Sequence, residues 1–199
     1  MTVRNGVLAL LAEQPMHAYQ LKQQFEQRTG GTWPLNIGQV WTTVHRLVRD
    51  GLVEPLPADE QPDAEHFRLT ADGRAEAAAW WARPVDRGAP ARDELVIKVA
   101  LAVTAPGVDV QDVIQHQRRE SMRVLHEYTR LKSTDGADDL AWSLVLDHLV
   151  FAAEAEVRWL DHVESRASRA ASEGRAPGTS DVADAPRPAA RRAPAGGTR

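Results

Sequence analysis

The stretch Leu35–Val53, LNIGQVWTTVHRLVRDGLV, constrains the fold more than any other part of the chain. Its large apolar residues recur every three or four positions, which is the spacing of the buried stripe of an amphipathic helix. They are Ile37, Val40, Trp41, Val44, Leu47 and Val48. Gly51 can end this helix at the C′ position, where the backbone often turns left-handed. Leu52 and Val53 then begin a predicted strand.

The opposite face of this predicted helix carries short hydroxyls, an amide and guanidinium groups, and Asp50 is its one acid. Such side chains can contact base edges and phosphates of DNA. We therefore interpret the stretch as a DNA-recognition helix followed by a β-hairpin wing. The alternative is the solvated side of an ordinary helix. The residues placed for the major groove are Gln39, Thr42, Thr43 and Arg46.

The elements around this stretch fit the same interpretation. Two shorter helices are expected before it, and a short strand pair and a further helix after it. The expected ranges are helices at about 2–13 and 17–29, strands at 53–56 and 66–69, and a helix through residue 81 capped by Thr70. This order matches a winged helix-turn-helix. The predicted fold class is mainly α with a small β-hairpin wing.

The second half of the chain is predicted to be helical, with a short helix at 93–102 and two long helices at about 109–132 and 138–165. The apolar residues of the long helices approach a heptad repeat, which is typical of helices that pack antiparallel or across a dimer. A helical hairpin cannot cover such stripes alone, so a partner chain is expected. The predicted domains are a DNA-binding domain at 1–90, a helical dimerisation domain at 91–165 and a disordered Ala/Arg/Pro-rich tail at 166–199.

Charge and composition narrow the class of function. The net charge of the chain is −4, whereas residues 1–50 carry a net charge of +2 and residues 51–82 one of −5. A DNA-binding surface must therefore be local. The chain has no cysteine, no long apolar run and no secretory leader, so we expect a cytoplasmic protein without membrane contact. The residues form no recognisable metal site or catalytic motif, so neither a cofactor nor an enzyme is expected.

Three segments resemble the PadR family of bacterial transcriptional regulators: MHAYQLKQQFEQRTGG, WPLNIGQVWTTVHRLVRDGLV and FRLTADGRAEAAAWW. The resemblance covers residues 5–81. Ala18 stands where the family commonly has glycine. Ala64–Glu65 precede the second wing strand, where the family often has a basic residue, and Arg68 is the nearest substitute.

This resemblance implies a homodimer that binds an inverted-repeat operator in double-stranded DNA, usually as a repressor, and that a small-molecule effector releases. The residues leave open an alternative, a winged helix that serves as a protein-interaction module without specific DNA binding. Tyr19, Lys22 and Arg49 are placed for phosphates. The full set of predicted DNA-binding residues is Tyr19, Lys22, Asn36, Gln39, Thr42, Thr43, Arg46, Arg49 and Arg68.

Six tryptophans raise the question of a ligand site. Trp33, Trp41, Trp80 and Trp81 are expected to pack in or beside the winged helix. Trp142 and Trp159 lie on the predicted dimerisation helices, where flat aromatic ligands can bind in PadR-like proteins. These two residues are the candidate ligand-binding residues, and packing at the dimer interface is the alternative.

Overall fold

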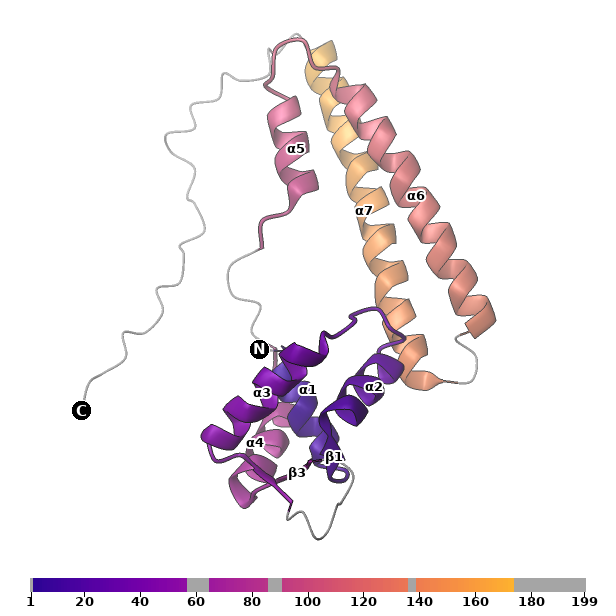
Figure 1. Ribbon diagram of the computed structural model, residues 1–199. Helices are drawn as coiled ribbons and strands as arrows, with labels where there is room; N and C mark the ends of the chain where they lie inside the picture. Colours follow the sequence, from indigo (N-terminus) through magenta and orange to yellow (C-terminus); the bar gives the residue numbers. More distant parts are fainter. Residues whose placement is uncertain (1, 57–64, 86–90, 136–138, 174–199) are drawn as a thin grey trace, which may run out of the picture. The chain divides into compact units, whose positions relative to one another are not determined.

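The computed structural model describes residues 2–56, 65–85, 91–135 and 139–173. It divides into two compact units: Met1–Val85 with Asp138–Val145, and Asp86–Ala137 with Leu146–Arg199. The structure is mainly helical with one three-stranded antiparallel sheet (Figure 1), which confirms the predicted fold class. None of the described helices is long and apolar enough to cross a bilayer.

The first unit is built on three helices, α1 (Thr2–Leu11), α2 (Ala18–Arg28) and α3 (Ile37–Arg49). α4 (Ala71–Ala82) packs on α1 and is capped by Thr70, whose hydroxyl accepts a hydrogen bond from the Gly73 amide, as predicted. The core between these elements is fully apolar. Its largest members are Leu8, Met16, Leu21, Val40, Val44, Leu47 and Phe67.

The predicted face of α3 is confirmed. Val40, Val44 and Leu47 are buried, while Ile37, Trp41 and Val48 are half-buried against the same core. Gly51 ends the helix with a φ of 73°. The amide of Leu52 donates to the carbonyl of Leu47 over 2.9 Å, and that of Gly51 donates to Val48 over 3.0 Å. These two bonds form the Schellman motif that a glycine at C′ permits.

The sheet contains one strand that the sequence did not indicate. β1 (Met16–His17) pairs with β3 (His66–Leu69), which also pairs with β2 (Val53–Pro55), so the order is β1-β3-β2. The expected helix at 17–29 therefore begins one residue later, because His17 belongs to β1 and caps α2. The wing loop at residues 57–64 lies outside the described residues.

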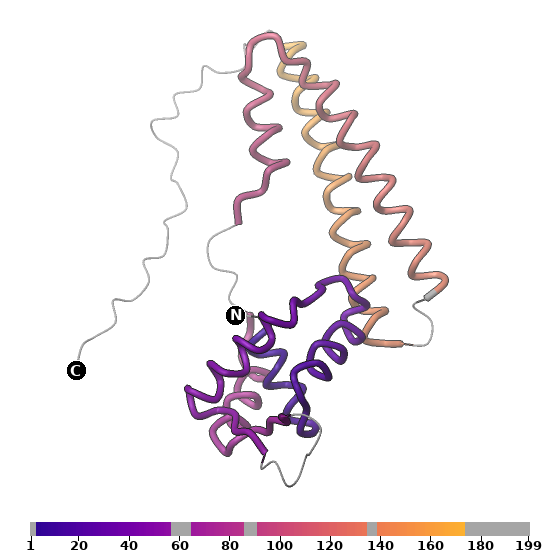
Figure 2. The backbone as a smooth tube through the Cα atoms, viewed as in Figure 1, coloured from indigo at the N-terminus to yellow at the C-terminus, as the bar shows by residue number. Residues whose placement is uncertain are grey.

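The second unit contains α5 (Glu94–Ala102), α6 (Val110–Asp135) and most of α7 (Leu140–Ser172). α6 and α7 run antiparallel, side by side (Figure 2), and polar pairs join them along their length. The pairs are Gln115–Glu164, Arg118–Asp161, Ser121–Glu156 and Lys132–Asp147. Buried apolar residues lie between these pairs, with Ile114, Leu146 and Leu160 fully buried.

Two expectations drawn from the sequence need correction. α7 continues to Ser172, past its expected end at Ser165, because the Ala and Arg residues of this segment still favour a helix. The remainder of the predicted tail, 174–199, lies outside the described residues. Trp33 and Trp81 do not pack in the core, since 48% and 70% of their surfaces are exposed. Trp41 and Trp80 are half-buried.

Candidate nucleic-acid interface

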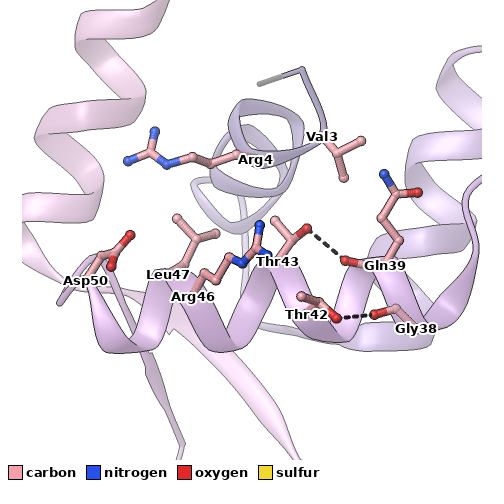
Figure 3. A pocket seen from close by; sticks show the side chains of 9 residues that line it. All are labelled: Val3, Arg4, Gly38, Gln39, Thr42, Thr43, Arg46, Leu47 and Asp50. Carbon is pink, nitrogen blue, oxygen red and sulfur yellow. Dashed lines mark hydrogen bonds between the residues drawn. The ribbon is translucent and has the colours of Figure 1, made fainter.

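The outward face of α3 brings four predicted residues together. Gln39, Thr42, Thr43 and Arg46 line one side of an open hollow of about 720 Å³, and the N-terminal end of α1 lines the other (Figure 3). Gln39, Thr42 and Arg46 are exposed, and Thr43 is half-buried. Successive members of this set lie within one helical turn of each other, so they form one continuous surface.

The two threonines are already hydrogen-bonded to their own helix. The hydroxyl of Thr42 donates to the carbonyl of Gly38 over 2.8 Å, and that of Thr43 donates to Gln39 over 2.7 Å (Figure 3). Their hydroxyl oxygens keep acceptor capacity, and their methyl groups remain available for apolar contact. Thr42 and Thr43 are therefore suited to accept hydrogen bonds or to contact a thymine methyl, rather than to donate.

Asn36 has a structural role at the start of α3. Its side-chain oxygen accepts a hydrogen bond from the amide of Gly38 over 2.8 Å, and its backbone is extended, as an N-cap requires. The side-chain amide group keeps its own donors. Asn36 thus fixes the end of the helix from which Gln39 projects.

A second predicted group lies on α2. Tyr19 and Lys22 line a separate hollow of about 670 Å³, together with Glu26 and the glycines that follow the helix. Tyr19 is 64% exposed. The ammonium of Lys22 donates to Glu26 over 2.7 Å, and the other oxygen of Glu26 accepts from the Leu35 amide over 2.8 Å. These two bonds, the one from Lys22 first, lower the pKa of the Glu26 carboxyl below its usual value.

Arg49 and Arg68 lie outside both hollows. Arg49 follows Arg46 on α3 and its guanidinium contacts Asp50 at 3.3 Å. Arg68 is on β3, directly across from Glu54 on β2, and its Nε donates to that carboxylate over 2.8 Å. Arg68 is thus the basic residue that the described part of the wing presents.

The structure adds one residue that sequence reasoning missed. Arg4, on α1, lies across the first hollow from Arg46 (Figure 3) and contacts Glu76 of α4 at 3.3 Å. Nothing in the sequence indicates that a basic residue near the start of the chain will lie opposite Arg46. Among the described residues, no group of three or more histidine or acidic side chains is arranged to hold a metal ion.

Comparison with known proteins gives this surface its context. Residues 7–79 match the transcriptional regulator PadR-like family. The winged-helix part of the chain is therefore PadR-like. Residues 91–167 match a second family, described as virulence activator alpha C-term. Together the two matches cover the winged helix and most of the helical second unit, and the first describes regulators of transcription rather than enzymes.

Individual relatives agree with this assignment. The probable transcriptional regulator Rv1176c of Mycobacterium tuberculosis is 25% identical over 181 residues, which cover 82% of this chain and 96% of that protein. The structure of Bacillus subtilis PadR in complex with operator DNA matches with a TM-score of 0.62 and 16% identity, over 84% of this chain and 99% of that one.

Two further structures share the fold. The complex of Bacillus subtilis PadR with p-coumaric acid matches with a TM-score of 0.65 and 17% identity, over 84% of this chain and 99% of that one. The Vibrio cholerae virulence activator AphA matches with a TM-score of 0.62 and 17% identity, over 84% of this chain and 98% of that one. The PadR-like fold is therefore present along both units.

Proposed function

We propose that this PadR-like chain is a homodimeric, sequence-specific DNA-binding protein of the cytoplasm that represses genes next to its own. The observation that carries the proposal is the outward face of α3, where Gln39, Thr42 and Arg46 are exposed on a rigid winged-helix frame. In helix-turn-helix proteins this helix enters the major groove. Relatives of this chain are regulators of transcription.

The proposed roles follow from the chemistry of each side chain. Arg46 suits a bidentate contact to guanine, and Gln39 suits adenine. Thr42 and Thr43 suit acceptor or methyl contacts at neighbouring bases. Tyr19, Lys22, Arg49 and Arg68 hold phosphates, which fix the register of the protein on the duplex but carry little sequence information. Asn36 supports α3 and keeps donors for a nearby phosphate.

The homodimer is proposed because the second unit leaves large apolar side chains exposed. Val96, Ile97 and Leu101 on α5 are between 46% and 63% exposed, and Phe151 on α7 is 63% exposed. Exposed apolar surface of this kind on a helical unit favours association with another helical surface. A second copy would bring two recognition helices to one duplex. The operator would be an inverted repeat with half-sites about 34 Å apart, one turn of B-DNA.

Relief by a small aromatic ligand is part of the proposal, supported by the PadR structure that contains p-coumaric acid. Trp142 and Trp159 remain the candidate residues. Seventeen positions of α7 separate them, which is about 25 Å of helix. A single flat ligand can therefore contact only one of the two in each protomer. Titration of tryptophan fluorescence with planar aromatic acids, repeated on Trp142→Phe and Trp159→Phe, would identify which one responds.

The central experiment is a mobility-shift titration of the full chain with DNA from upstream of its own gene. A dimer that shifts this fragment, with binding that weakens steeply as salt rises, supports the proposal. Footprinting should then show two protected half-sites. The absence of any shift at about 50 mM salt, where phosphate contacts are strong, would favour a winged helix that serves as a protein-interaction module. Derepression of the neighbouring genes on deletion would support repression, and their loss would indicate activation.

A further inference from the structure

All three cations proposed to bind phosphates lie beside a carboxylate of the same chain. Each pair is within the distance of a hydrogen-bonded ion pair. The pairs are Lys22 with Glu26 at 2.7 Å, Arg49 with Asp50 at 3.3 Å, and Arg68 with Glu54 at 2.8 Å. All three pairs lie on the unit that carries the recognition helix.

The fold itself places these carboxylates. Lys22 and Glu26 are one turn apart on α2. Glu54 and Arg68 are direct partners in the β2–β3 ladder, so their side chains share one face of the hairpin. Asp50, the third carboxylate, is the C-cap residue of α3 and adjoins Arg49.

The carboxylate of Glu26 is also tied to the backbone. One of its oxygens accepts the hydrogen bond from the Leu35 amide, at the entrance to α3, and the other holds Lys22. The carboxylate therefore stays in place if Lys22 turns to another anion. The lowered pKa of Glu26, caused by the same two bonds, keeps it charged at neutral pH.

Arg46, the cation proposed to contact bases, differs from these three. Among the residues that the structure describes, no carboxylate forms an ion pair with Arg46, although Asp50 lines the same hollow. Among the four cations predicted to bind DNA, pairing with a carboxylate is thus confined to the three proposed for phosphates. It follows that carboxylates of the chain compete with DNA phosphates for these cations, which weakens the sequence-independent part of DNA binding. Arg46 has no such competitor among the described residues and can contact a base.

We propose that Glu26, Asp50 and Glu54 set the affinity of this surface for DNA, because each holds a cation that a DNA phosphate must take over on binding. This inference rests on the proposed DNA-binding function. Exposed ion pairs of this kind are weak enough for a phosphate to replace. The carboxylate left behind then takes up a salt cation. Each exchanged pair therefore reduces the net release of counterions from DNA by roughly one.

Glu54→Gln in the full-length chain tests the inference, because its amide has nearly the shape of the carboxylate without the charge. Two duplexes of equal length serve as probes: one selected by the wild-type chain from a random-sequence pool, and one of random sequence. The variant should bind both about tenfold more tightly at about 50 mM salt, and its salt dependence should steepen by roughly one charge. Both duplexes should respond alike, since both present the same phosphates.

A double-mutant cycle with Arg68→Gln shows whether Glu54 acts through its partner. In that background, Glu54→Gln should change the affinity by less than about twofold. Asp50→Asn and Glu26→Gln should behave as Glu54→Gln does. The matched control is Glu120→Gln, which removes a similar ion pair, to Arg123 on α6, and should leave DNA affinity unchanged.

Three results would overturn the inference while the wild-type chain still binds DNA. The first is that Glu54→Gln changes neither the affinity nor its salt dependence. The second is that Glu54→Gln binds DNA more weakly, which would mean that Glu54 orients Arg68 for DNA. The third is that Glu54→Gln gains the same affinity in the wild-type and Arg68→Gln backgrounds. If the wild-type chain bound neither duplex at about 50 mM salt, the proposed function itself would fail, and the inference with it.

Discussion

The indole of Trp142 lies against the α-carbon of Gly30, so that a Cβ on Gly30 would overlap the ring. Gly30 ends α2 with a φ of 58°, a left-handed conformation that favours glycine. Trp142, from the first turn of α7, thus packs within the winged-helix unit. A glycine at this position satisfies both the turn and the close approach of the ring.

Gly30→Ala should therefore destabilise the winged-helix unit. The left-handed backbone costs an alanine about 1–2 kcal/mol, and displacing the indole adds about 1–3 kcal/mol. Urea unfolding should show the loss. Gly31→Ala is the matched control, because Gly31 has a φ of 69° but nothing lies within 4 Å of its Cβ position. Gly31→Ala should lose only the stability that the left-handed backbone conformation costs an alanine. Equal losses in the two variants would contradict the packing role of Trp142.

Arg46→Ala should reduce operator selectivity, because an arginine bidentate to guanine contributes about 1–3 kcal/mol of discrimination. Affinities for the selected duplex and a random duplex, measured at one salt concentration, would give the ratio directly. An equal loss on the two duplexes would show that Arg46 contacts phosphate instead.

Lys22→Ala should weaken binding to every sequence alike, since phosphates are the same in all duplexes. The slope of log affinity against log salt should become shallower by roughly one charge. A loss confined to the selected duplex would place Lys22 at a base edge rather than at the backbone.

His17 should make stability depend on pH. Its Nδ1 accepts the hydrogen bond of the Gln20 amide over 3.2 Å and so caps α2, and its ring meets His66 edge to face at 5.1 Å between centroids. Burial, and then the charge of His66, lower the pKa of His17 below 6.5. The neutral ring is therefore favoured in the fold. Its contribution is complete above pH 6.5 and decreases as the pH falls towards the folded pKa.

His17→Asn isolates this effect, because asparagine caps a helix equally well but does not titrate. At neutral pH the variant should match the wild type to within about 0.5 kcal/mol. Urea unfolding below pH 6.5 should show a smaller loss in the variant than in the wild type. Parallel losses would assign the pH dependence to groups other than His17.

Leu101→Asp should shift the chain from dimer to monomer, because Leu101 is 63% exposed on α5 within the proposed apolar interface. An exposed side chain contributes little to the fold of one protomer, so the monomer should remain folded. Sedimentation velocity would measure the dimer fraction, and far-UV circular dichroism the helix content. Arg119→Asp, at an exposed position of α6, provides the control. A dimer that survives Leu101→Asp would place the interface elsewhere.

The sequence was a good guide where strong local chemistry sets the structure. The buried face of α3 and its end at Gly51 follow from apolar periodicity and from a residue without a side chain, and both were predicted correctly. β1 was missed because two residues are too few to show an alternating pattern. The extension of α7 was missed because alanine and arginine suit both a helix and a polar tail.

The candidate site was predictable only in part, for a related reason. The spacing along α3 places Gln39 and Arg46 on one face. The contacts of Arg4 with Glu76 and of Arg68 with Glu54 join residues far apart in the sequence, and only the fold brings them together. The role of Asn36 was only partly predictable. Asparagine suits both helix capping and DNA contact, and the structure shows that it caps α3.

The winged-helix unit is not continuous in the sequence, since it includes Asp138–Val145 as well as Met1–Val85. A fragment cut after Val85 would keep Gly30 but lose Trp142, and would expose the surface that the indole covers. The winged-helix unit therefore cannot be exchanged between relatives as a simple N-terminal segment. Recombination among PadR-like proteins should preserve function only where the first turn of α7 comes from the same parent as the helices that it covers.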